Sequence, residues 1–155
     1  MRLTDILQPE CVKVPLEATS KQQAIFELVD LLADAVGLDD RDALRKAVWQ
    51  REVTRTTGIG HGIAIPHGKC KGVRSLALAI GKPRTPIDFD AIDGRPVDVI
   101  ILLTSPEDQT GPHIQALAQI SRLLTDSNFR AAIKKASTAD ELYQHIVEHE
   151  SRAAV

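Results

Sequence analysis

The chain is poor in aromatic residues and in cysteine. Phe, Trp and Tyr make up only 3% of its 155 residues, so a core has to be built mainly from Leu, Ile, Val and Ala. The two cysteines, Cys11 and Cys70, form neither a CxxC pair nor a disulfide framework. Hydrophobic residues nevertheless reach 43%, so the composition is that of a globular domain large enough to need no disulfide.

An excess of charge of one sign and long hydrophobic runs are also missing. The formal net charge is −2, which gives no electrostatic reason to expect nucleic acid as a partner. The first ten residues, MRLTDILQPE, lack the apolar segment of a signal peptide. No stretch approaches the ~18 apolar residues of a membrane-spanning helix. We therefore expect a cytoplasmic protein that does not insert into a membrane.

Local signals predict helices at both ends of the chain. The first begins near Ser20, whose spacing to Gln23 fits a capping box, and ends at Gly37. Apolar residues repeat at helical period between these ends: Ile25, Leu28, Val29, Leu32 and Val36. Further helices are predicted over residues 40–52, from Pro112 to Leu124, after Ser127 and, with a Thr138–Glu141 capping box, after Thr138.

The middle of the chain favours strands. Residues 75–80 and 97–103 are predicted strands, and the second is almost continuously apolar, so we expect it to be buried on both faces. Residues 87–90 alternate apolar side chains with aspartates, which predicts an exposed strand, and Asp93–Gly94 predicts a turn. Helices that precede and follow a group of strands predict an α/β layer architecture, with one domain over residues 1–155.

Two histidines, His61 and His67, lie in the glycine-rich stretch REVTRTTGIGHGIAIPHGKC, residues 51–70. Glycine permits positive φ and close backbone approach, and Pro66 restricts φ immediately before His67. Such a turn can direct backbone N–H groups at an anion while it holds one imidazole in place. The residues alone favour a plainer interpretation, in which His67 is a structural histidine bonded to the backbone.

His113 falls on the apolar stripe of the helix predicted after Pro112, together with Leu117, Ile120 and Leu124. A buried structural histidine is again the plainer interpretation. No GxxxxGK[ST] pattern is present, so nucleotide binding through a P-loop is not supported. A metal-dependent hydrolase is one alternative function, but the spacing of its candidate ligands fits neither HExxH nor a paired CxxC site. Those candidates are His61, His67, Cys70 and His113.

The segment GIGHGIAIPHGK, residues 58–69, resembles the active-site signature of the enzyme IIA proteins of the bacterial phosphotransferase system, in the fructose/mannitol superfamily. The nitrogen-regulatory type is the best match, and a free-standing chain of this length also resembles that type. An Arg-Glu pair sixteen residues before His67, the strand VDVIILLTSP and the following PHIQALAQISRLL match in order and spacing. The resemblance therefore covers essentially the whole chain.

The resemblance implies a mixed β-sheet with helices packed on both faces, and a phosphoryl carrier that needs no cofactor and no metal. His67 would be the phosphorylated residue and attack through Nε2, which leaves Nδ1–H for a backbone carbonyl. His113 would donate to the phosphoryl oxygens, and Arg51 would stabilise charge in the same pocket. The donor would be an HPr-like phosphocarrier of the NPr type, and the acceptor would be regulated target proteins or an enzyme IIB.

Several questions stay open within this interpretation. A fructose/mannitol-type transport enzyme IIA would pass phosphate to an enzyme IIB, whereas a regulatory one would bind targets differently in its two states. A binding module that has lost phosphorylation is a further alternative. The sequence names no targets and no oligomeric state, and it leaves the roles of His61, Thr57 and Cys70 open. Some of the isoleucines near His67 are expected to form an apolar docking rim: Ile59, Ile63 and Ile65.

Overall fold

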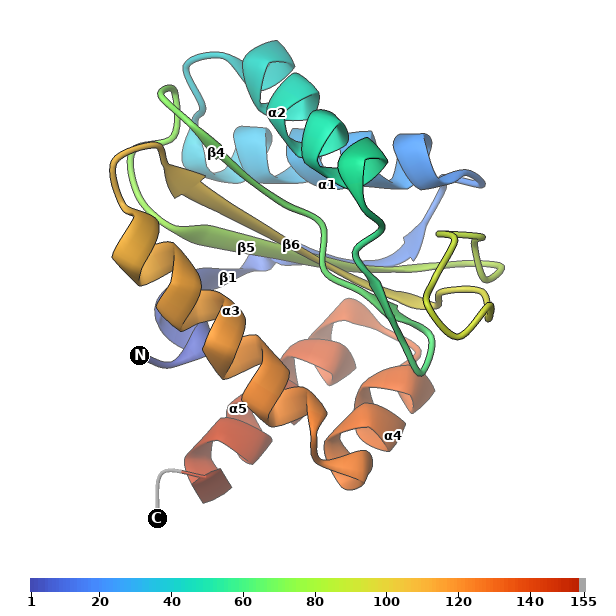
Figure 1. Cartoon of the computed structure of the whole chain (residues 1–155). Helices are drawn as coiled ribbons and strands as arrows, with labels where there is room; N and C mark the ends of the chain where they lie inside the picture. The colour runs from blue at the N-terminus through green and yellow to red at the C-terminus, as the bar shows by residue number, and fades with distance from the viewer. Residues whose placement is uncertain (154–155) are drawn as a thin grey trace.

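A computed structural model describes residues 1–153, which form one mixed β-sheet between two layers of helices (Figure 1). In chain order, its elements are a 3-10 turn η1 (Leu3–Asp5), β1 (Leu7–Leu16), α1 (Lys21–Val36), α2 (Arg41–Thr54), β2 (Gly58–Gly60), β3 (Ile63–Ala64), β4 (His67–Cys70), β5 (Ala77–Pro83), β6 (Val99–Pro106), α3 (Thr110–Leu124), α4 (Ser127–Lys135) and α5 (Ala139–Ala153).

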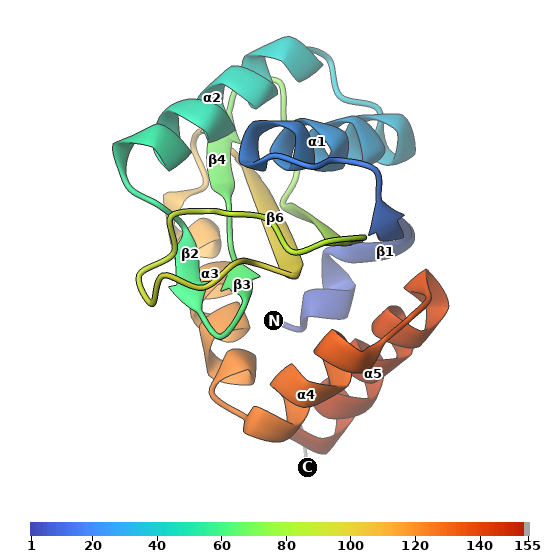
Figure 2. The ribbon, with the colours of Figure 1, turned by 90° about the vertical axis from the view of Figure 1, so that its right-hand side faces the viewer.

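Strand β6 is the centre of the sheet. The strand order is β1-β5-β6-β3-β2, and β4 also pairs with β6, beyond the point where β3 ends. The pairs β1–β5, β3–β6 and β4–β6 are parallel, whereas β5–β6 and β2–β3 are antiparallel. Helices α1 and α2 cover one face, and α3, α4 and α5 cover the other (Figures 1 and 2). The predicted mixed sheet with helices on both faces is confirmed.

Both ends of α1 are set by the local signals that predicted them. Ser20 caps α1, because its hydroxyl accepts a hydrogen bond from the N–H of Gln23 at 3.3 Å. The reciprocal bond of the capping box is displaced by one residue, since the Gln23 amide oxygen accepts from the N–H of Thr19. Gly37 ends α1 in the left-handed conformation at φ 69°, and Asp40 caps α2.

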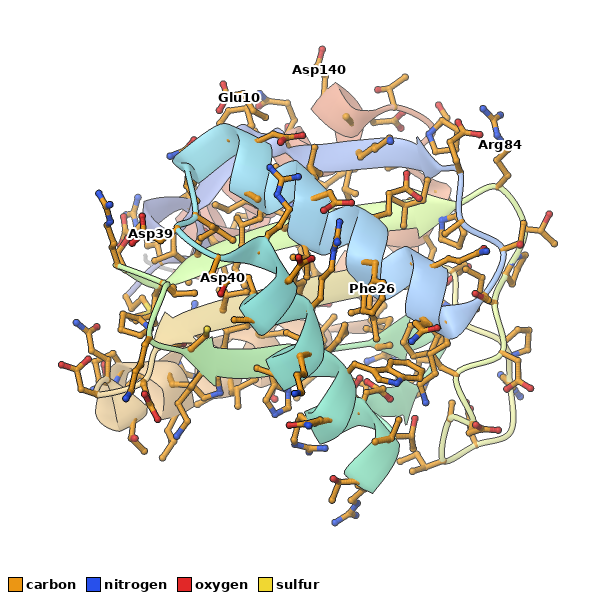
Figure 3. All side chains as sticks on the ribbon, turned by 90° about the horizontal axis from the view of Figure 1, so that it is seen from above. Glu10, Phe26, Asp39, Asp40, Arg84 and Asp140 are labelled. Carbon is orange, nitrogen blue, oxygen red and sulfur yellow. The ribbon has the colours of Figure 1, made fainter. Side chains whose placement is uncertain are left out.

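The two helices on this face pack against each other as well as on the sheet. The rings of Phe26 on α1 and Trp49 on α2 meet edge to face, with centroids 6.5 Å apart. Figure 3 shows Phe26 between these helices and Asp40 at the start of α2. Of the twelve largest fully buried side chains, all but Phe89 are Leu or Ile, so the aliphatic core expected from composition is confirmed. None of the helices within residues 1–153 is long and apolar enough to cross a membrane.

The exposed strand predicted over residues 87–90 is wrong. Pairing in this segment is limited to one isolated bridge between Ile87 and Val97, and Asp90 leaves the extended region at φ 53°. Phe89 is fully buried, so the alternation of apolar and acidic residues reflects a loop that lies against the core. The turn predicted at Asp93–Gly94 is present, with Gly94 at φ 74°.

Two parts of the sheet were not predicted from the sequence. Strand β1 shows no regular alternation of buried and exposed residues, because its register against β5 shifts twice. The stretch 51–70 is not a single glycine-rich loop, since it holds the end of α2 and three short strands. His67 is the first residue of β4, opposite Leu103 of β6. Parallel pairing with a strand so distant in the sequence leaves no local signal.

Candidate functional site

The ring of His67 is fixed by the backbone immediately before it. Its Nδ1 lies 2.8 Å from the carbonyl oxygen of Ile65. A carbonyl oxygen only accepts hydrogen bonds, so Nδ1 carries the hydrogen and the neutral ring keeps a lone pair on Nε2. Burial lowers the pKa of His67 below its usual 6.5, and the charge of Arg51 lowers it further against the opposing effect of the Ile65 carbonyl. His67 is therefore a neutral imidazole with a nucleophilic Nε2 near pH 7.

His113 lies beside His67, as the family resemblance implied. It occupies the first turn of α3, is only 6% exposed, and its ring centroid is 5.5 Å from that of His67. Its Nδ1 lies 2.6 Å from the buried hydroxyl oxygen of Ser105 on β6. Burial lowers the pKa of His113 to about 4, and the neighbouring His67 and Lys69 act in the same direction. His113 is thus neutral at physiological pH and can act as a hydrogen-bond donor.

Arg51 and His67 line the same hollow, which has a volume of about 300 Å³. Arg51 is in the last turn of α2, and its Nη1 donates to the carbonyl oxygen of Arg55 at 2.9 Å. Within residues 1–153 it forms no ion pair with a carboxylate. The other walls come from β2, α3 and the loop before β6. The structure therefore places His67 in one hollow with Arg51 and beside His113, which does not line that hollow itself.

A buried carboxylate supports the backbone that carries His67. Glu52 is 1% exposed, and its side chain accepts hydrogen bonds from the N–H of Thr57 at 2.8 Å and from the Thr57 hydroxyl. Its charge is balanced by Lys21 Nζ at 2.9 Å. The carbonyl oxygen of Thr57 in turn accepts from the N–H of Ile65 at 3.0 Å. This chain of contacts links α2 to the residue whose carbonyl orients His67.

Sequence reasoning missed the positions of Glu52 and Ser105. Glu52 directly follows Arg51 in the sequence, and nothing in a polar helix end indicates that its carboxylate is fully buried. Ser105 falls within the segment VDVIILLTSP, but a serine at a strand end is ordinary. The only sequence signal is that Ser105 precedes His113 by eight residues. This separation indicates a contact only when the packing of the strand against the helix is known.

Gly68 explains how close α2 comes to the strand that carries His67. A Cβ at Gly68 would lie 2.9 Å from Val48 Cγ2 and 3.2 Å from the Val48 backbone nitrogen. Any larger residue would therefore push α2 away from β4. Because Arg51 is on α2 and His67 is on β4, this close packing sets the separation of the two side chains.

His61 and Cys70 do not join this site. His61 has φ 58° in the exposed turn between β2 and β3, where its N–H donates to Asp93 Oδ2 at 3.1 Å. Cys70 is half-buried at the end of β4. Within the described part of the chain, no three His, Cys, Asp or Glu side chains are grouped so that they could hold a metal ion. The hydrolase alternative therefore has no ligand set in residues 1–153.

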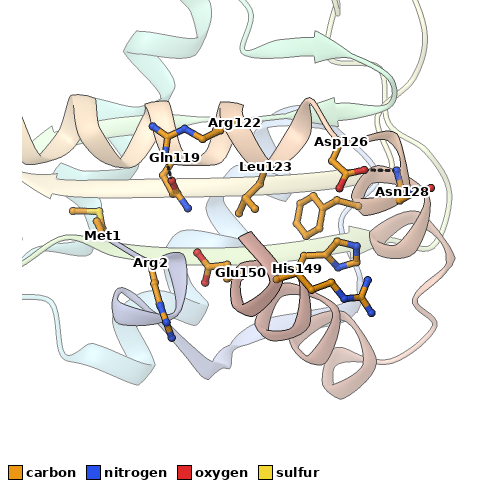
Figure 4. A pocket seen from close by; sticks show the side chains of 11 residues that line it. Met1, Arg2, Gln119, Arg122, Leu123, Asp126, Asn128, His149 and Glu150 are labelled. Atoms are coloured by element: carbon orange, nitrogen blue, oxygen red, sulfur yellow. Dashed lines mark hydrogen bonds between the residues drawn. The ribbon is translucent and has the colours of Figure 1, made fainter. Parts of the chain in front are cut away.

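A second hollow, of about 560 Å³, lies among η1, α3, α4 and α5 (Figure 4). It is larger, but it shares no residue with the hollow beside His67. Its buried carboxylate, Glu150, is already bonded to the backbone N–H groups of Leu3 and Thr4. We therefore assign Glu150 a structural role, the attachment of the first residues to α5.

Comparison with known proteins shows the family to which the chain belongs. A family model described as phosphoenolpyruvate-dependent sugar phosphotransferase system, EIIA 2, matches residues 5–149. The chain belongs to this family. This enzyme IIA is 37% identical over 143 residues to a nitrogen regulatory protein of Bradyrhizobium diazoefficiens. The matched region covers 92% of this chain and 93% of that protein.

Two further comparisons extend the picture. The enzyme IIA is 33% identical over 150 residues to the fructose-specific EIIABC component of Bacillus subtilis, covering 97% of this chain but 24% of that longer protein. Its fold matches the crystal structure of the nitrogen regulatory protein IIA-Ntr from Neisseria meningitidis with a TM-score of 0.83 and 31% identity. That match covers 92% of this chain and 97% of the other.

Proposed function

We propose that this enzyme IIA accepts a phosphoryl group on Nε2 of His67 from an HPr-like, NPr-type phosphocarrier, and signals or relays its phosphorylation state to partner proteins. One observation carries the proposal: the Nδ1–H of His67 is bound to the Ile65 carbonyl, which leaves Nε2 as the nucleophile, and the ring lies beside His113 and in one hollow with Arg51. The nitrogen-regulatory relatives support a regulatory role.

The geometry suits phosphoryl transfer between two imidazoles. The lone pair on His67 Nε2 forms a bond to phosphorus while the bond from phosphorus to the donor's imidazole nitrogen breaks, and the electron pair of that bond returns to the donor. Charge spreads over the three phosphoryl oxygens in a loose transition state, so the protein mainly positions groups and supplies donors. His113 and the guanidinium of Arg51 are those donors. The proton on Nδ1 of His67 stays on that nitrogen and remains hydrogen-bonded to the Ile65 carbonyl throughout the transfer.

A transport role is the second candidate, because the fructose-specific EIIABC component is almost as similar to this chain as the nitrogen regulatory protein is. A transport enzyme IIA would pass its phosphoryl group to an enzyme IIB. Mixing the phosphorylated protein with a purified fructose-type enzyme IIB distinguishes the two. We expect the phosphoryl group to remain on His67. Rapid transfer of this group to the enzyme IIB would favour a transport role.

Partner contact is proposed at the apolar side chains around the hollow. Ile59 is 41% exposed and Ile92 is 73% exposed, and both line the hollow beside His67. Of the three isoleucines among which rim residues were expected, Ile63 and Ile65 are buried and only Ile59 is exposed. A phosphoryl group adds roughly two negative charges next to this surface. We expect that charge to weaken a partner that docks on the apolar rim and to favour one that presents arginine.

The proposed site is tested by phosphorylation in vitro. The protein is incubated with enzyme I, an HPr-like carrier and phosphoenolpyruvate, and intact mass is measured. We expect one acid-labile phosphoryl group on the wild type and none on His67→Ala. His61→Ala is the matched control, because His61 is exposed on the same segment but lies outside the hollow, and it should be labelled normally. Undiminished labelling of His67→Ala would show that the site is elsewhere.

A further inference from the structure

The hydroxyl group of Ser105 has a single hydrogen-bond partner within residues 1–153. Ser105 is 0% exposed in β6, and its Oγ lies 2.6 Å from Nδ1 of His113. Water is therefore excluded from this hydroxyl, and the imidazole nitrogen has to satisfy it. The direction of this hydrogen bond decides which nitrogen of His113 carries the proton.

The two possible directions differ in what they leave unpaired. A serine hydroxyl has one hydrogen to donate and two lone pairs that accept. If Nδ1 of His113 carried the hydrogen, it would donate to Ser105 Oγ, and the buried hydroxyl hydrogen would have no acceptor. If the hydroxyl donates to an unprotonated Nδ1, the hydroxyl hydrogen has an acceptor. The ring hydrogen is then on Nε2 of His113, where it can be donated to another group. Buried donors without an acceptor are rare and costly, so the second direction is favoured.

We propose that Ser105 is a positioning residue that holds His113 as the Nε2–H tautomer, so that His113 can donate a hydrogen bond to a phosphoryl oxygen on His67. This inference rests on the proposed function. The two rings then have complementary states. In His67 the Ile65 carbonyl holds the hydrogen on Nδ1 and leaves a lone pair on Nε2, whereas in His113 the serine occupies Nδ1 and leaves N–H at Nε2.

The arrangement of the rings supports this division of roles. Their centroids are 5.5 Å apart with planes inclined at 57°, and no direct hydrogen bond joins the two rings in the described structure. Each ring is anchored at Nδ1, so the nitrogen available to a third group is Nε2 in both cases. A lone pair on one ring and an N–H on its neighbour suit a group that forms a bond through phosphorus and accepts a hydrogen bond through oxygen. Burial keeps His113 neutral, which makes its tautomer decisive.

Strand β6 offers a matched control one residue away. Thr104 is also fully buried, and its hydroxyl donates to the carbonyl oxygen of Ala77 at 3.3 Å. Thr104→Val removes a buried hydroxyl from the same strand without touching His113. If Ser105→Ala slows phosphoryl transfer only because it disturbs β6, Thr104→Val should slow transfer to a similar extent. If Ser105→Ala slows transfer because the His113 tautomer changes, Thr104→Val should not, and Ser105→Thr, which keeps the hydroxyl, should restore the rate.

The first measurement uses the wild-type protein. Proton–nitrogen correlation spectra of the imidazole rings, recorded near pH 7 and assigned with a His113→Gln sample, should show His113 with hydrogen on Nε2 and none on Nδ1. A hydrogen on Nδ1 of His113 overturns the proposal, whatever the variants do. This measurement needs no phosphoryl donor. A wild-type protein that is never labelled would instead overturn the proposed function.

The second measurement is the rate of phosphoryl transfer from the HPr-like carrier. We expect Ser105→Ala to be slower by about 10- to 100-fold, the usual effect of losing a group that orients an active residue, and to show a mixture of His113 tautomers. Ser105→Thr and Thr104→Val should keep the Nε2–H tautomer and near-normal rates. A Ser105→Ala protein with wild-type rate and tautomer would refute the role of Ser105, as would equal slowing by Thr104→Val.

Discussion

Glu52→Ala should be among the most damaging single substitutions near the site, although Glu52 touches no reacting atom. The side chain accepts two hydrogen bonds from Thr57 and forms an ion pair with Lys21, whose side chain is only 16% exposed. Alanine would leave the Thr57 N–H and hydroxyl without an acceptor and the ammonium without its carboxylate. Lys21 would keep its hydrogen bond to the Phe89 carbonyl at 3.0 Å.

The size of the effect follows from these contacts. Removing one partner of a buried ion pair costs about 3–5 kcal/mol, because the other charge is left uncompensated. Each lost hydrogen bond to a charged group is worth about 1.5–3 kcal/mol, but these losses overlap with that of the ion pair and do not add to it in full. We therefore expect Glu52→Ala to lower the free energy of unfolding by about 3–5 kcal/mol. That is a large part of the ~5–15 kcal/mol typical of a whole domain.

Denaturant unfolding of three variants measures the prediction. Glu52→Ala, Lys21→Met and the double variant form a double-mutant cycle, which isolates the coupling between the two charges. The double variant should lose about 1–3 kcal/mol less than the sum of the single losses, since it leaves no unpaired charge. The control is Glu17→Ala, because Glu17 pairs with Arg84 at 2.9 Å while both side chains are more than 60% exposed. Its loss should be much smaller, because solvent screens an exposed ion pair.

The same proteins connect stability to the site. Where Glu52→Ala remains folded, it should also accept the phosphoryl group more slowly, because Thr57 and Ile65 no longer hold the carbonyl that orients His67. A loss of stability equal to that of Glu17→Ala would refute the argument from burial. Strict additivity in the double-mutant cycle would show that Glu52 and Lys21 are not coupled.

Two further predictions concern the histidines and Arg51. His113→Ala and Arg51→Ala should each slow phosphoryl transfer to His67 on the order of 10²-fold, because each removes a donor to oxygens that gain charge in the transition state; wild-type rates in rapid-quench labelling would reduce both to structural residues. His113 should also make the fold acid-sensitive. Its pKa falls to about 4 in the folded protein, whereas an unfolded histidine has a pKa of about 6.5. The unfolded chain therefore binds more protons between these values, and stability falls as the pH decreases, by about 3 kcal/mol from pH 7 to pH 4. Unfolding of wild type and His113→Gln at both pH values checks this, and the variant should lack that part of the decrease; an equal decrease in both proteins would contradict it.

The helix ends show what the sequence by itself determined. Ser20 and Gly37 act through groups within a few residues of themselves, so the hydroxyl of one and the φ preference of the other predicted where α1 begins and ends. The apolar run at the start of β6 likewise predicted a strand buried on both faces, because burial on two sides favours apolar residues at successive positions. The family resemblance depended on a contiguous motif, residues 58–69, and on elements in a recognisable order.

The arrangement of the site was decided by tertiary structure. His67 meets His113 only because β4 pairs in parallel with β6 and α3 follows β6 back across the sheet. Tertiary structure also explains the strand that was missed and the one that was wrong. The register of β1 against β5 is irregular, so its burial follows no regular local period. Residues 87–90 do alternate between buried and exposed, but they pair only through the bridge between Ile87 and Val97, so the segment is a loop.

The protonation states of the two histidines belong to this second class. The sequence supplies an imidazole at each position, but the hydrogen-bond partner of each Nδ1 comes from the folded backbone or from another strand. Burial by the packed helices then lowers both pKa values, which no single residue type specifies. Local chemistry determined which residues are available, and long-range packing, through desolvation and the direction of two hydrogen bonds, decided what each of them can do.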